Sequence, residues 1–445
     1  MRVVVIGGVA AGMSAASQAK RRMKEAEVIV LEKTGDVSYG SCGMPYNLMR
    51  LDNPMDELVV LTADDFRNKR GIDVRLFQEA RRIDREKKEV EVWDSRENRI
   101  YNIGYDKLVI ATGARAINLP MEKQINGVFT LRTLEDGKRL KNFIKERKPK
   151  KAFLIGAGRI ALEIVHALHE LEMSIVMVKK RPGRILPQFE EEISEKVEAK
   201  LREKGINFIS GVEIKGFMEK DGFLKKVVTS EGEFEAELSV ISIGVQPNIE
   251  VAEKAGIKIG ETGAIEVDRY LRTSDRDIFA CGDCCEHYHR LLKKPVFSPS
   301  GTVANKQGRI AGANAIGANI IYPGVVGTSI FSFFDLTVAR TGLVKEEIKE
   351  DFVKTVILSQ TRGHAYPGSS PIKIVLFSER GTGRLLGAQM IGKEYVWGRI
   401  NVVAACLYKD FTVDDLSSLD MAYSPPFSPV WDPLLIAANR AKKSI

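Results

Sequence analysis

The sequence has few of the features that would place it in a membrane or among secreted, disulfide-rich proteins. No apolar stretch approaches the roughly 20 residues that a bilayer-spanning helix needs, so we expect no membrane insertion. Only five cysteines occur in 445 residues. This odd, scattered set gives no disulfide framework and fits a reducing, cytoplasmic location. The apolar opening continues directly into an amphipathic helix and therefore predicts a first strand instead of a signal peptide.

Charge of one sign is not concentrated in any part of the chain. Lys and Arg number 67 against 59 Asp and Glu, which gives a net charge of +8. The two signs are interleaved, as on a solvated surface. Because no basic stripe with interleaved aromatic residues is present, the sequence predicts no nucleic-acid partner. The length predicts two to four domains with ample apolar residues to bury.

Two similar nucleotide-binding patterns organise the sequence. The first joins an apolar strand, a glycine turn over 7–12, a helix and a second strand ending in Glu32. This is the dinucleotide-binding fingerprint in its required context, although Val9 stands at the usual middle glycine. Gly7 permits the tight turn and Gly12 permits close packing of the helix. Glu32 is placed to accept hydrogen bonds from ribose hydroxyls.

The second pattern covers 151–178 and keeps the glycine spacing, with Gly156 and Gly158. Its second strand ends in a basic cluster instead of an acid. The cluster consists of Lys179, Lys180 and Arg181. Cationic side chains at this place suit a 2′-phosphate, so the sequence predicts that NADPH is accepted, alongside NADH. The alternative interpretation is a solvated basic loop.

Cys42 stands alone after the first pattern, with no second cysteine nearby. Ser38 and Ser41 precede it, and Gly43 and Pro45 follow at what reads as the start of a helix. A thiol near the positive end of a helix dipole tends toward the reactive thiolate. The alternative is a buried structural cysteine, which is the more common fate of a single Cys.

A second group of cysteines, Cys281, Cys284 and Cys285, surrounds a Gly-Asp turn at Asp283. A Cys-x-x-Cys pair can be a redox pair or half of a metal site. No second pair of this kind exists, although His287 follows closely. We therefore expect structural cysteines and no metal.

Taken together, the paired dinucleotide patterns, the strand ending in Thr112-Gly113, the Gly-Asp283 turn and the lone cysteine resemble the flavoprotein disulfide reductases with two dinucleotide-binding domains. The resemblance covers essentially the whole chain. It implies an α/β fold with two Rossmann-like domains, for FAD and NAD(P)H, and an α+β C-terminal domain that forms a homodimer. The implied divisions are 1–116 and 266–326 for FAD, 117–265 for NAD(P)H and 327–445 for dimerisation.

The resemblance also implies sets of cofactor-binding residues. Those for FAD are Gly7, Gly8, Ala11, Gly12, Glu32, Lys33, Thr112, Gly113, Asp283 and Ala304. Those for NAD(P)H are Gly156, Gly158, Ile160, Glu163, Lys179, Lys180, Arg181 and Gly244.

The run Ser-x-x-x-Cys-Gly-Met-Pro-Tyr around Cys42 is similar to the single-cysteine branch, which contains coenzyme A disulfide reductases, NAD(P)H oxidases and CoA-dependent sulfur or polysulfide reductases. Oxidases of that branch have a histidine where this chain has Ala10, which favours the coenzyme A enzymes. The implied CoA-binding residues are Ser14, Gln18, Arg21, Arg22, Ser38, Ser41 and Arg70. Tyr366 and Tyr423 match tyrosines that one subunit supplies to the cysteine of the other.

The predicted reaction passes electrons from NAD(P)H through FAD to Cys42, which reduces CoA disulfide, CoA persulfide or polysulfide. Coenzyme A would serve as the missing second thiol, and the thiolate would attack the next sulfur. Three alternatives stay open at this point. They are an NAD(P)H oxidase that reduces oxygen, a reductase that passes electrons to a protein partner without the cysteine, and a flavin-binding redox sensor with little turnover.

Overall fold

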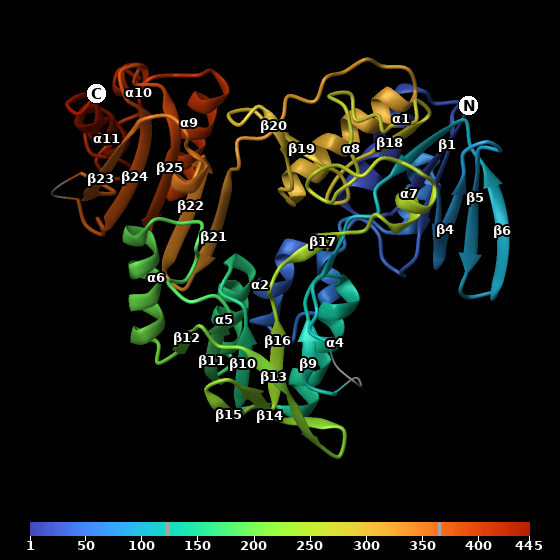
Figure 1. Cartoon of the computed structure of the whole chain (residues 1–445), viewed down its shortest axis with the longest axis horizontal. Coiled ribbons are helices and arrows are strands. Elements are labelled where there is room, and N and C mark those ends of the chain that lie inside the picture. The colour runs from blue at the N-terminus through green and yellow to red at the C-terminus, as the bar shows by residue number, and fades with distance from the viewer. Residues whose placement is uncertain (121–124, 364–365) are drawn as a thin grey trace.

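The computed structural model describes residues 1–120, 125–363 and 366–445. The chain forms three units around separate sheets (Figure 1). The N-terminal unit and the C-terminal unit lie at opposite ends, and the second unit lies below and between them in this view. In the described residues, no helix is both long and apolar enough to cross a bilayer.

The first unit is a five-stranded parallel sheet in the order β18-β7-β1-β2-β3. Its strands are β1 (Arg2–Ile6), β2 (Glu27–Glu32), β3 (Asp73–Leu76), β7 (Lys107–Ile110) and β18 (Ile278–Ala280). Side chains alternate between the two faces of a strand. Val3 and Val5 accordingly pack under helices, while Val4 and Ile6 pack on a second, smaller sheet. Both faces of the sheet are therefore covered, and its central strands β1, β2 and β7 are mostly apolar.

Helices α1 (Ala10–Arg22) and α8 (Gly301–Ala315) lie side by side on one face of this sheet. They approach closely because α8 presents glycines. A Cβ at Gly308 would lie 2.2 Å from the carbonyl oxygen of Ala11, and one at Gly312 would lie 2.1 Å from that of Ala15. The opposite face carries the antiparallel meander β4 (Gln78–Asp84), β5 (Glu89–Asp94) and β6 (Arg99–Gly104).

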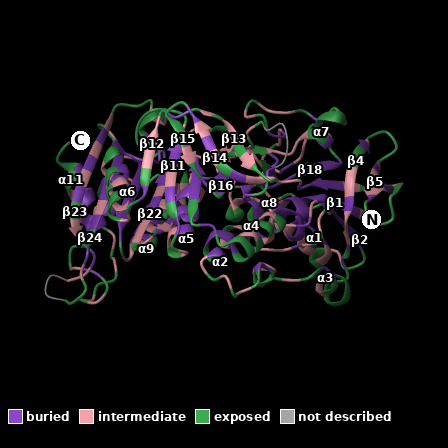
Figure 2. Cartoon of the chain, turned by 90° about the horizontal axis from the view of Figure 1, so that it is seen from below, coloured by how far each residue is buried: buried purple, intermediate pink, exposed green. Residues whose placement is uncertain are grey.

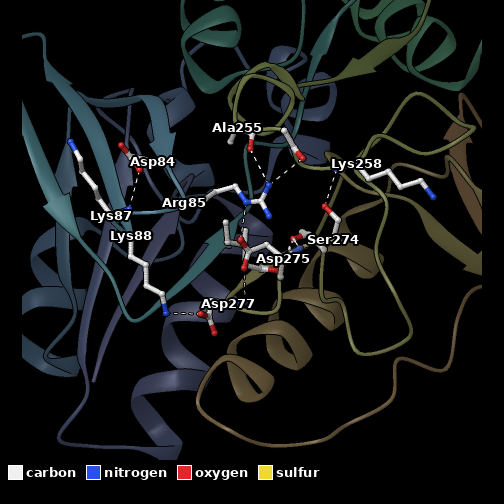
Figure 3. A network of polar contacts seen from close by, with 12 residues as sticks. Asp84, Arg85, Lys87, Lys88, Ala255, Lys258, Ser274, Asp275 and Asp277 are labelled. Atoms are coloured by element: carbon white, nitrogen blue, oxygen red, sulfur yellow. Dashed lines mark hydrogen bonds and ion pairs between the residues drawn. The ribbon is translucent and has the colours of Figure 1, made fainter.

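The closing strand β18 comes from far along the chain and is fixed by ion pairs (Figure 3). Asp277, just before β18, accepts hydrogen bonds from Lys107 of β7 and from Lys88 of the meander. Arg85 donates to Asp275 at 2.8 Å. The return segment is thus joined both to the sheet and to the meander.

The second unit repeats this architecture, with the order β12-β11-β10-β16-β9. Its strands are β9 (Val128–Thr130), β10 (Lys151–Ile155), β11 (Ser174–Lys179), β12 (Asn207–Ser210) and β16 (Leu238–Ile241). Its helices are α4 (Leu134–Arg147), α5 (Arg159–Glu170) and α6 (Glu191–Glu203). An antiparallel sheet of β13 (Ile214–Lys220), β14 (Phe223–Thr229) and β15 (Gly232–Glu235) packs beside it.

Short elements connect these units. The two linkers pair with each other as β8 (Ala114–Ala116) and β17 (Val245–Pro247). The remaining elements of the linkers and the first unit are α2 (Met44–Leu48), α3 (Ala63–Arg70), α7 (Glu250–Lys254), β19 (His287–His289) and β20 (Lys294–Val296).

The third unit is an antiparallel sheet in the order β21-β22-β25-β24-β23, covered on one face by helices. The strands are β21 (Ser329–Phe333), β22 (Leu336–Gly342), β23 (Phe352–Gln360), β24 (Pro371–Glu379) and β25 (Leu385–Gly392). The helices are α9 (Val396–Tyr408), α10 (Val413–Ser417) and α11 (Pro433–Lys442). Figure 2 shows buried strands along the whole length of the molecule, and one apolar cluster joins the helices of the second unit to the sheet of the third. The predicted fold class is confirmed, while the division points at 116, 265 and 326 stay a prediction.

Candidate functional site

The first glycine turn joins β1 to α1 in a geometry that only glycine allows. Gly7 has a φ of +104°, and a Cβ there would lie 2.2 Å from the carbonyl oxygen of Ala111. A Cβ at Gly12 would lie 1.8 Å from the carbonyl oxygen of Gly7. The helix therefore begins directly over the strand, as a dinucleotide-binding turn requires.

The buried carboxylate of Glu32 lies beside this turn at the end of β2. It accepts hydrogen bonds from the backbone N–H of Gly8 at 2.7 Å and from the backbone N–H of Thr34 at 2.8 Å. Lys33, the next predicted FAD residue, is exposed. The acid thus stands where ribose hydroxyls meet this kind of unit, and its orientation is fixed by the turn itself.

The other predicted FAD residues gather at the ends of β7, β18 and α8. Asp283 accepts a hydrogen bond from Arg132 at 2.6 Å and another from the N–H of Ser300, just before α8, at 3.1 Å. Thr112 donates to the carbonyl of Asn248 at 2.6 Å. A Cβ on Gly113 would meet nothing within 4 Å.

These positions fit a flavin dinucleotide. Ala11 and Ala304 are small and buried at the α1–α8 contact, close to the Asp283 turn. Gln307 accepts from the N–H of Gly282 at 2.9 Å, and its buried amide nitrogen has no partner in the described residues. A buried donor of this kind is normally satisfied, so this wall is complete only with a bound group.

The second glycine turn repeats the first with less crowding. Gly156 has a φ of +130°, and a Cβ there would lie 2.1 Å from the carbonyl oxygen of Ser242. Gly158 has an ordinary φ of −92° and open space around its Cβ position. Ile160 is in the first turn of α5, while Gly244 lies after β16 and its carbonyl accepts from the N–H of Ile117. The turn leaves the start of α5 accessible.

The basic cluster 179–181 lies at the end of β11, as the sequence predicts. Lys179 donates to the carbonyl of Arg184 at 2.6 Å, and burial lowers its pKa. Lys180 pairs with Glu213 at 2.8 Å, but both side chains are mostly exposed. Arg181 is also exposed. Lys180 and Arg181 therefore present charge to solvent, and the surface ion pair costs little to exchange.

Glu163 of α5 is buried and bonded to the segment that carries the lone cysteine. The hydroxyl of Tyr46 donates to Glu163 at 2.9 Å. Burial raises the pKa of Glu163 and raises the pKa of Tyr46 to about 12. The N–H of Ser332, in the third unit, donates to the same hydroxyl at 3.4 Å. All three units meet at this tyrosine.

Cys42 is exposed, whereas every other cysteine is buried. It lies in a single 3-10 turn, Ser41–Gly43, followed by α2. The loop is tied to the first glycine turn, since the N–H of Ser38 donates to the carbonyl of Gly8 at 2.9 Å. Helix α2 is only five residues long. The expected dipole effect on the thiol is therefore weak, because the macrodipole sums over aligned peptide units.

The residues predicted for coenzyme A lie mainly on α1 and the elements beside it. Arg21 donates to Gln18 at 2.9 Å. Arg70, at the end of α3, donates to Ser17 at 3.3 Å and stacks over Phe66.

The other members of this set extend the same face. Ser14 accepts from Asn305 of α8 at 2.9 Å, and Arg22 is exposed at the last position of α1. Ser38 and Ser41 belong to the cysteine loop. Hydrogen bonds thus join α3 to α1 through Arg70 and Ser17, and the cysteine loop to the turn before α1 through Ser38 and Gly8.

The two predicted tyrosines lie apart from this group, in the third unit. Tyr366 is half-exposed beneath Arg362, and Tyr423 lines a cleft of about 550 Å³ beside Val430 and Trp431. Residues 364–365, part of the predicted tyrosine segment, lie outside the described residues. In the part of the chain that the structure describes, neither tyrosine is hydrogen-bonded to the cysteine loop.

The cysteines around Asp283 are structural in their surroundings. Cys281, Cys284 and Cys285 are completely buried, and burial raises the pKa of all three thiols. Cys284 contacts the carbonyl of Ile110 at 3.5 Å. The described residues contain no group of three side chains suited to hold a metal ion.

Sequence reasoning missed several residues that shape the site. Arg132 fixes Asp283, Asn305 joins α8 to α1, and Tyr46 joins the cysteine segment to Glu163. Lys141 is buried on α4 and donates to the segment after α2. Only Lys141 had a visible signal, as a lysine within an otherwise apolar helix face; the others depend on contacts between distant segments.

Two dinucleotide units, an exposed thiol and a separate antiparallel domain together indicate an oxidoreductase that works with nucleotide cofactors. The chain belongs to the pyridine nucleotide-disulphide oxidoreductases. Residues 1–308 match that family, and residues 328–433 match its dimerisation domain. Its cofactors are FAD and NAD(P)H.

Named relatives cover the whole chain. An NAD(P)H coenzyme A polysulfide/persulfide reductase of Pyrococcus horikoshii is 36% identical, over 99% of this chain and 98% of the relative. An NADH oxidase of Methanocaldococcus jannaschii is 32% identical, over 100% and 99%. The structure of an NAD-dependent persulfide reductase from A. fulgidus superposes with a TM-score of 0.95 at 39% identity. That superposition covers 100% of this chain and 83% of the other.

Proposed function

We propose that the protein is an NAD(P)H-dependent, FAD-containing reductase that reduces coenzyme A disulfide, coenzyme A persulfide or polysulfide through Cys42. The observation that carries this proposal is the placement of Cys42. It is the exposed thiol among five, its loop is bonded to the flavin-type turn, and its helix is bonded to the nicotinamide unit. The polysulfide/persulfide reductase relative supports the sulfur substrate.

In the proposed reaction the Cys42 thiolate attacks one sulfur of the acceptor and the sulfur–sulfur bond breaks. One thiolate leaves, and Cys42 holds the other half as a mixed disulfide. FAD, when bound, supplies the electron pair that it takes from NAD(P)H. Two-electron reduction of the mixed disulfide would restore the Cys42 thiolate and release the second thiol. One NAD(P)H is oxidised for each disulfide reduced.

The surface formed by α1 and α3 suits an anionic substrate. Arg21 and Arg70 lie on adjacent helices at the same end of the first unit. Guanidinium groups pair well with phosphates, such as those of coenzyme A. Their present partners are the neutral side chains of Gln18 and Ser17, so binding a phosphate would break no ion pair there.

The dimerisation domain supports a homodimer, and an exposed apolar surface on the third unit offers the contact. Its members are Leu358, Tyr423, Phe427, Val430 and Trp431. Exposed apolar surface of this kind marks interaction sites. Among the described residues, neither tyrosine is hydrogen-bonded to the cysteine loop, and we propose that Tyr366 and Tyr423 serve the thiol of the partner subunit. Free thiols at every cysteine fit the proposed cytoplasmic location.

Oxygen is a second candidate acceptor, because one relative is named an NADH oxidase. Ala10, at the start of α1, carries no group that could donate a proton to a reduced oxygen species. We therefore place oxygen reduction second to sulfur reduction.

Replacing Cys42 with serine tests the function. We expect C42S to keep its flavin but to lose NAD(P)H-dependent reduction of CoA disulfide and polysulfide by at least about a hundredfold, because the hydroxyl is a poor nucleophile at sulfur. The control is Cys406→Ser, which changes a buried thiol of the third unit. Retention of disulfide reduction in C42S would show that electrons leave without the cysteine. Oxygen consumption measured in parallel separates the oxidase alternative.

A further inference from the structure

Helix α4 of the nicotinamide unit lies against the short helix α2 that follows Cys42. Contact at the start of α2 depends on a glycine. A Cβ on Gly137 would lie 3.0 Å from the sulfur of Met44 and 3.2 Å from that of Met55. Gly137 therefore provides the room in which Met44, the first residue of α2, packs on α4.

One turn further along α4, Lys141 binds the other end of α2. Its ammonium donates to the backbone carbonyls of Asn47, Arg50 and Asn53 at 2.9, 2.6 and 2.5 Å. The side-chain oxygen of Asn47 lies 2.6 Å from the same nitrogen, so the three N–H donors are shared among four oxygens. The side chain is almost completely buried. The carbonyls of Asn47 and Arg50 each also accept one backbone N–H, from Arg50 and Asn53. The ammonium therefore uses the second lone pair of these oxygens and joins α2 to the loop that follows it.

Further attachments of this segment come from the nicotinamide unit. Lys138 pairs with Asp36 at 3.0 Å and with Asp56 at 2.7 Å, on the two sides of the cysteine loop. Tyr46 donates to Glu163 of α5. The thiol belongs to the first unit in sequence, yet several contacts that support its segment come from the second.

We propose that Lys141 is a positioning residue for Cys42, holding the end of α2 against α4 so that the thiol keeps its place at the junction of the two units. The role of Cys42 in this inference rests on the proposed function. The burial of Lys141 argues that this side chain does more than fill space between α2 and α4. An apolar residue would cover α4 equally well, as Leu140 and Ile144 do, whereas an ammonium is expensive to bury unless oxygens receive it.

The test compares Lys141→Met with the wild type. Methionine keeps the length and the apolar stem but cannot donate. We expect faster amide hydrogen exchange over 44–53 and a changed rate of Cys42 alkylation by iodoacetamide, both measured without NAD(P)H. Oxidation of the reduced enzyme by CoA disulfide should slow by about tenfold, because small misplacements of a reacting group are costly. Reduction of the flavin by NAD(P)H should stay within about twofold, since that step does not use the thiol.

Two further variants complete the test. Lys145→Met, one turn along α4 at an exposed position, is the matched control and should behave as wild type. Lys141→Arg should recover most of the acceptor step, because guanidinium can donate to the same carbonyls. If Lys141→Met does not fold, Gly137→Ala displaces Met44 from the other end and should slow the same step. Equal slowing of both half-reactions, or unchanged exchange and alkylation in Lys141→Met, would overturn the proposal.

Turnover retained in C42S would instead contradict the proposed function. The exchange and alkylation results would then still show whether Lys141 positions the thiol.

Discussion

The two dinucleotide units have the same strand order but differ in how closely their parts approach. In the first, a Cβ at Gly12 would overlap the carbonyl oxygen of Gly7 at 1.8 Å. In the second, the corresponding residue is Ala161, whose Cβ is accommodated although the residue is fully buried. The β2 strand ends in a buried acid that binds its own turn, while β11 ends in exposed basic residues. The same fold thus occurs with two kinds of glycine turn, a tightly packed one in the first unit and a more open one in the second.

The two units also differ in residue at the middle glycine position, but their backbone conformations there are similar. Val9 stands there in the first unit with a φ of −101°, and Gly158 stands there in the second with a φ of −92°. Neither value lies in the left-handed region, so the backbone does not require glycine. Val9 is therefore no defect in the first pattern.

The largest expected effect is that of Gly12→Ala, which tests the tight packing of the first glycine turn. The new Cβ has no room beside the Gly7 carbonyl, so α1 must move away from β1 and from the flavin site. We expect flavin content to fall from near one per chain to below about a tenth, with loss of stability in the upper range for point mutations. Absorbance of the purified protein measures the flavin. Ala161→Gly is the matched control and should retain it; full flavin content in G12A would contradict the crowding argument.

The next effect concerns the basic cluster. The double variant Lys180→Ala/Arg181→Ala should raise the KM for NADPH by at least about tenfold and leave that for NADH nearly unchanged, because only NADPH carries the 2′-phosphate. Steady-state kinetics with both cofactors measure this. Lys220→Ala/Lys225→Ala removes the same charge from exposed sites elsewhere in this unit. Equal shifts for both cofactors would support the solvated-loop interpretation.

The smallest effect concerns Asp277, which fixes the closing strand of the first unit. Hydrogen bonds from Lys107 and then Lys88 lower its pKa to about 2. Because the folded pKa lies below the unfolded one, this stabilisation is present above about pH 4 and is lost as the pH falls toward 2. We expect Asp277→Asn to lower the free energy of unfolding at pH 7 by about 2 kcal/mol and to flatten its pH dependence below 4.

Denaturant unfolding across this pH range measures the effect. Asp221→Asn, at an exposed turn, is the control and should follow the wild type. An unchanged acid limb in Asp277→Asn would show that these ion pairs add little to the closing strand.

Much of the fold could be predicted because its signals are local. Gly7 and Gly156 precede amphipathic helices and follow apolar strands, and this spacing fixes a strand–turn–helix unit without distant contacts. The acid Glu32 and the basic cluster at 179–181 were likewise visible at the ends of their strands. Contacts across the chain were not visible. Arg132 and Asp283 lie far apart in sequence, and nothing near Tyr46 indicates that it meets Glu163.

The sequence by itself determined the two dinucleotide units, the family resemblance and the unusual isolation of Cys42, because each depends on short-range spacing and residue type. Only the tertiary structure decided which thiol is exposed and what supports it. The helix after Cys42 is too short to hold its own position, since most helical stability comes from packing. The packing that fixes it comes from α4 and α5, more than 80 residues away in the chain.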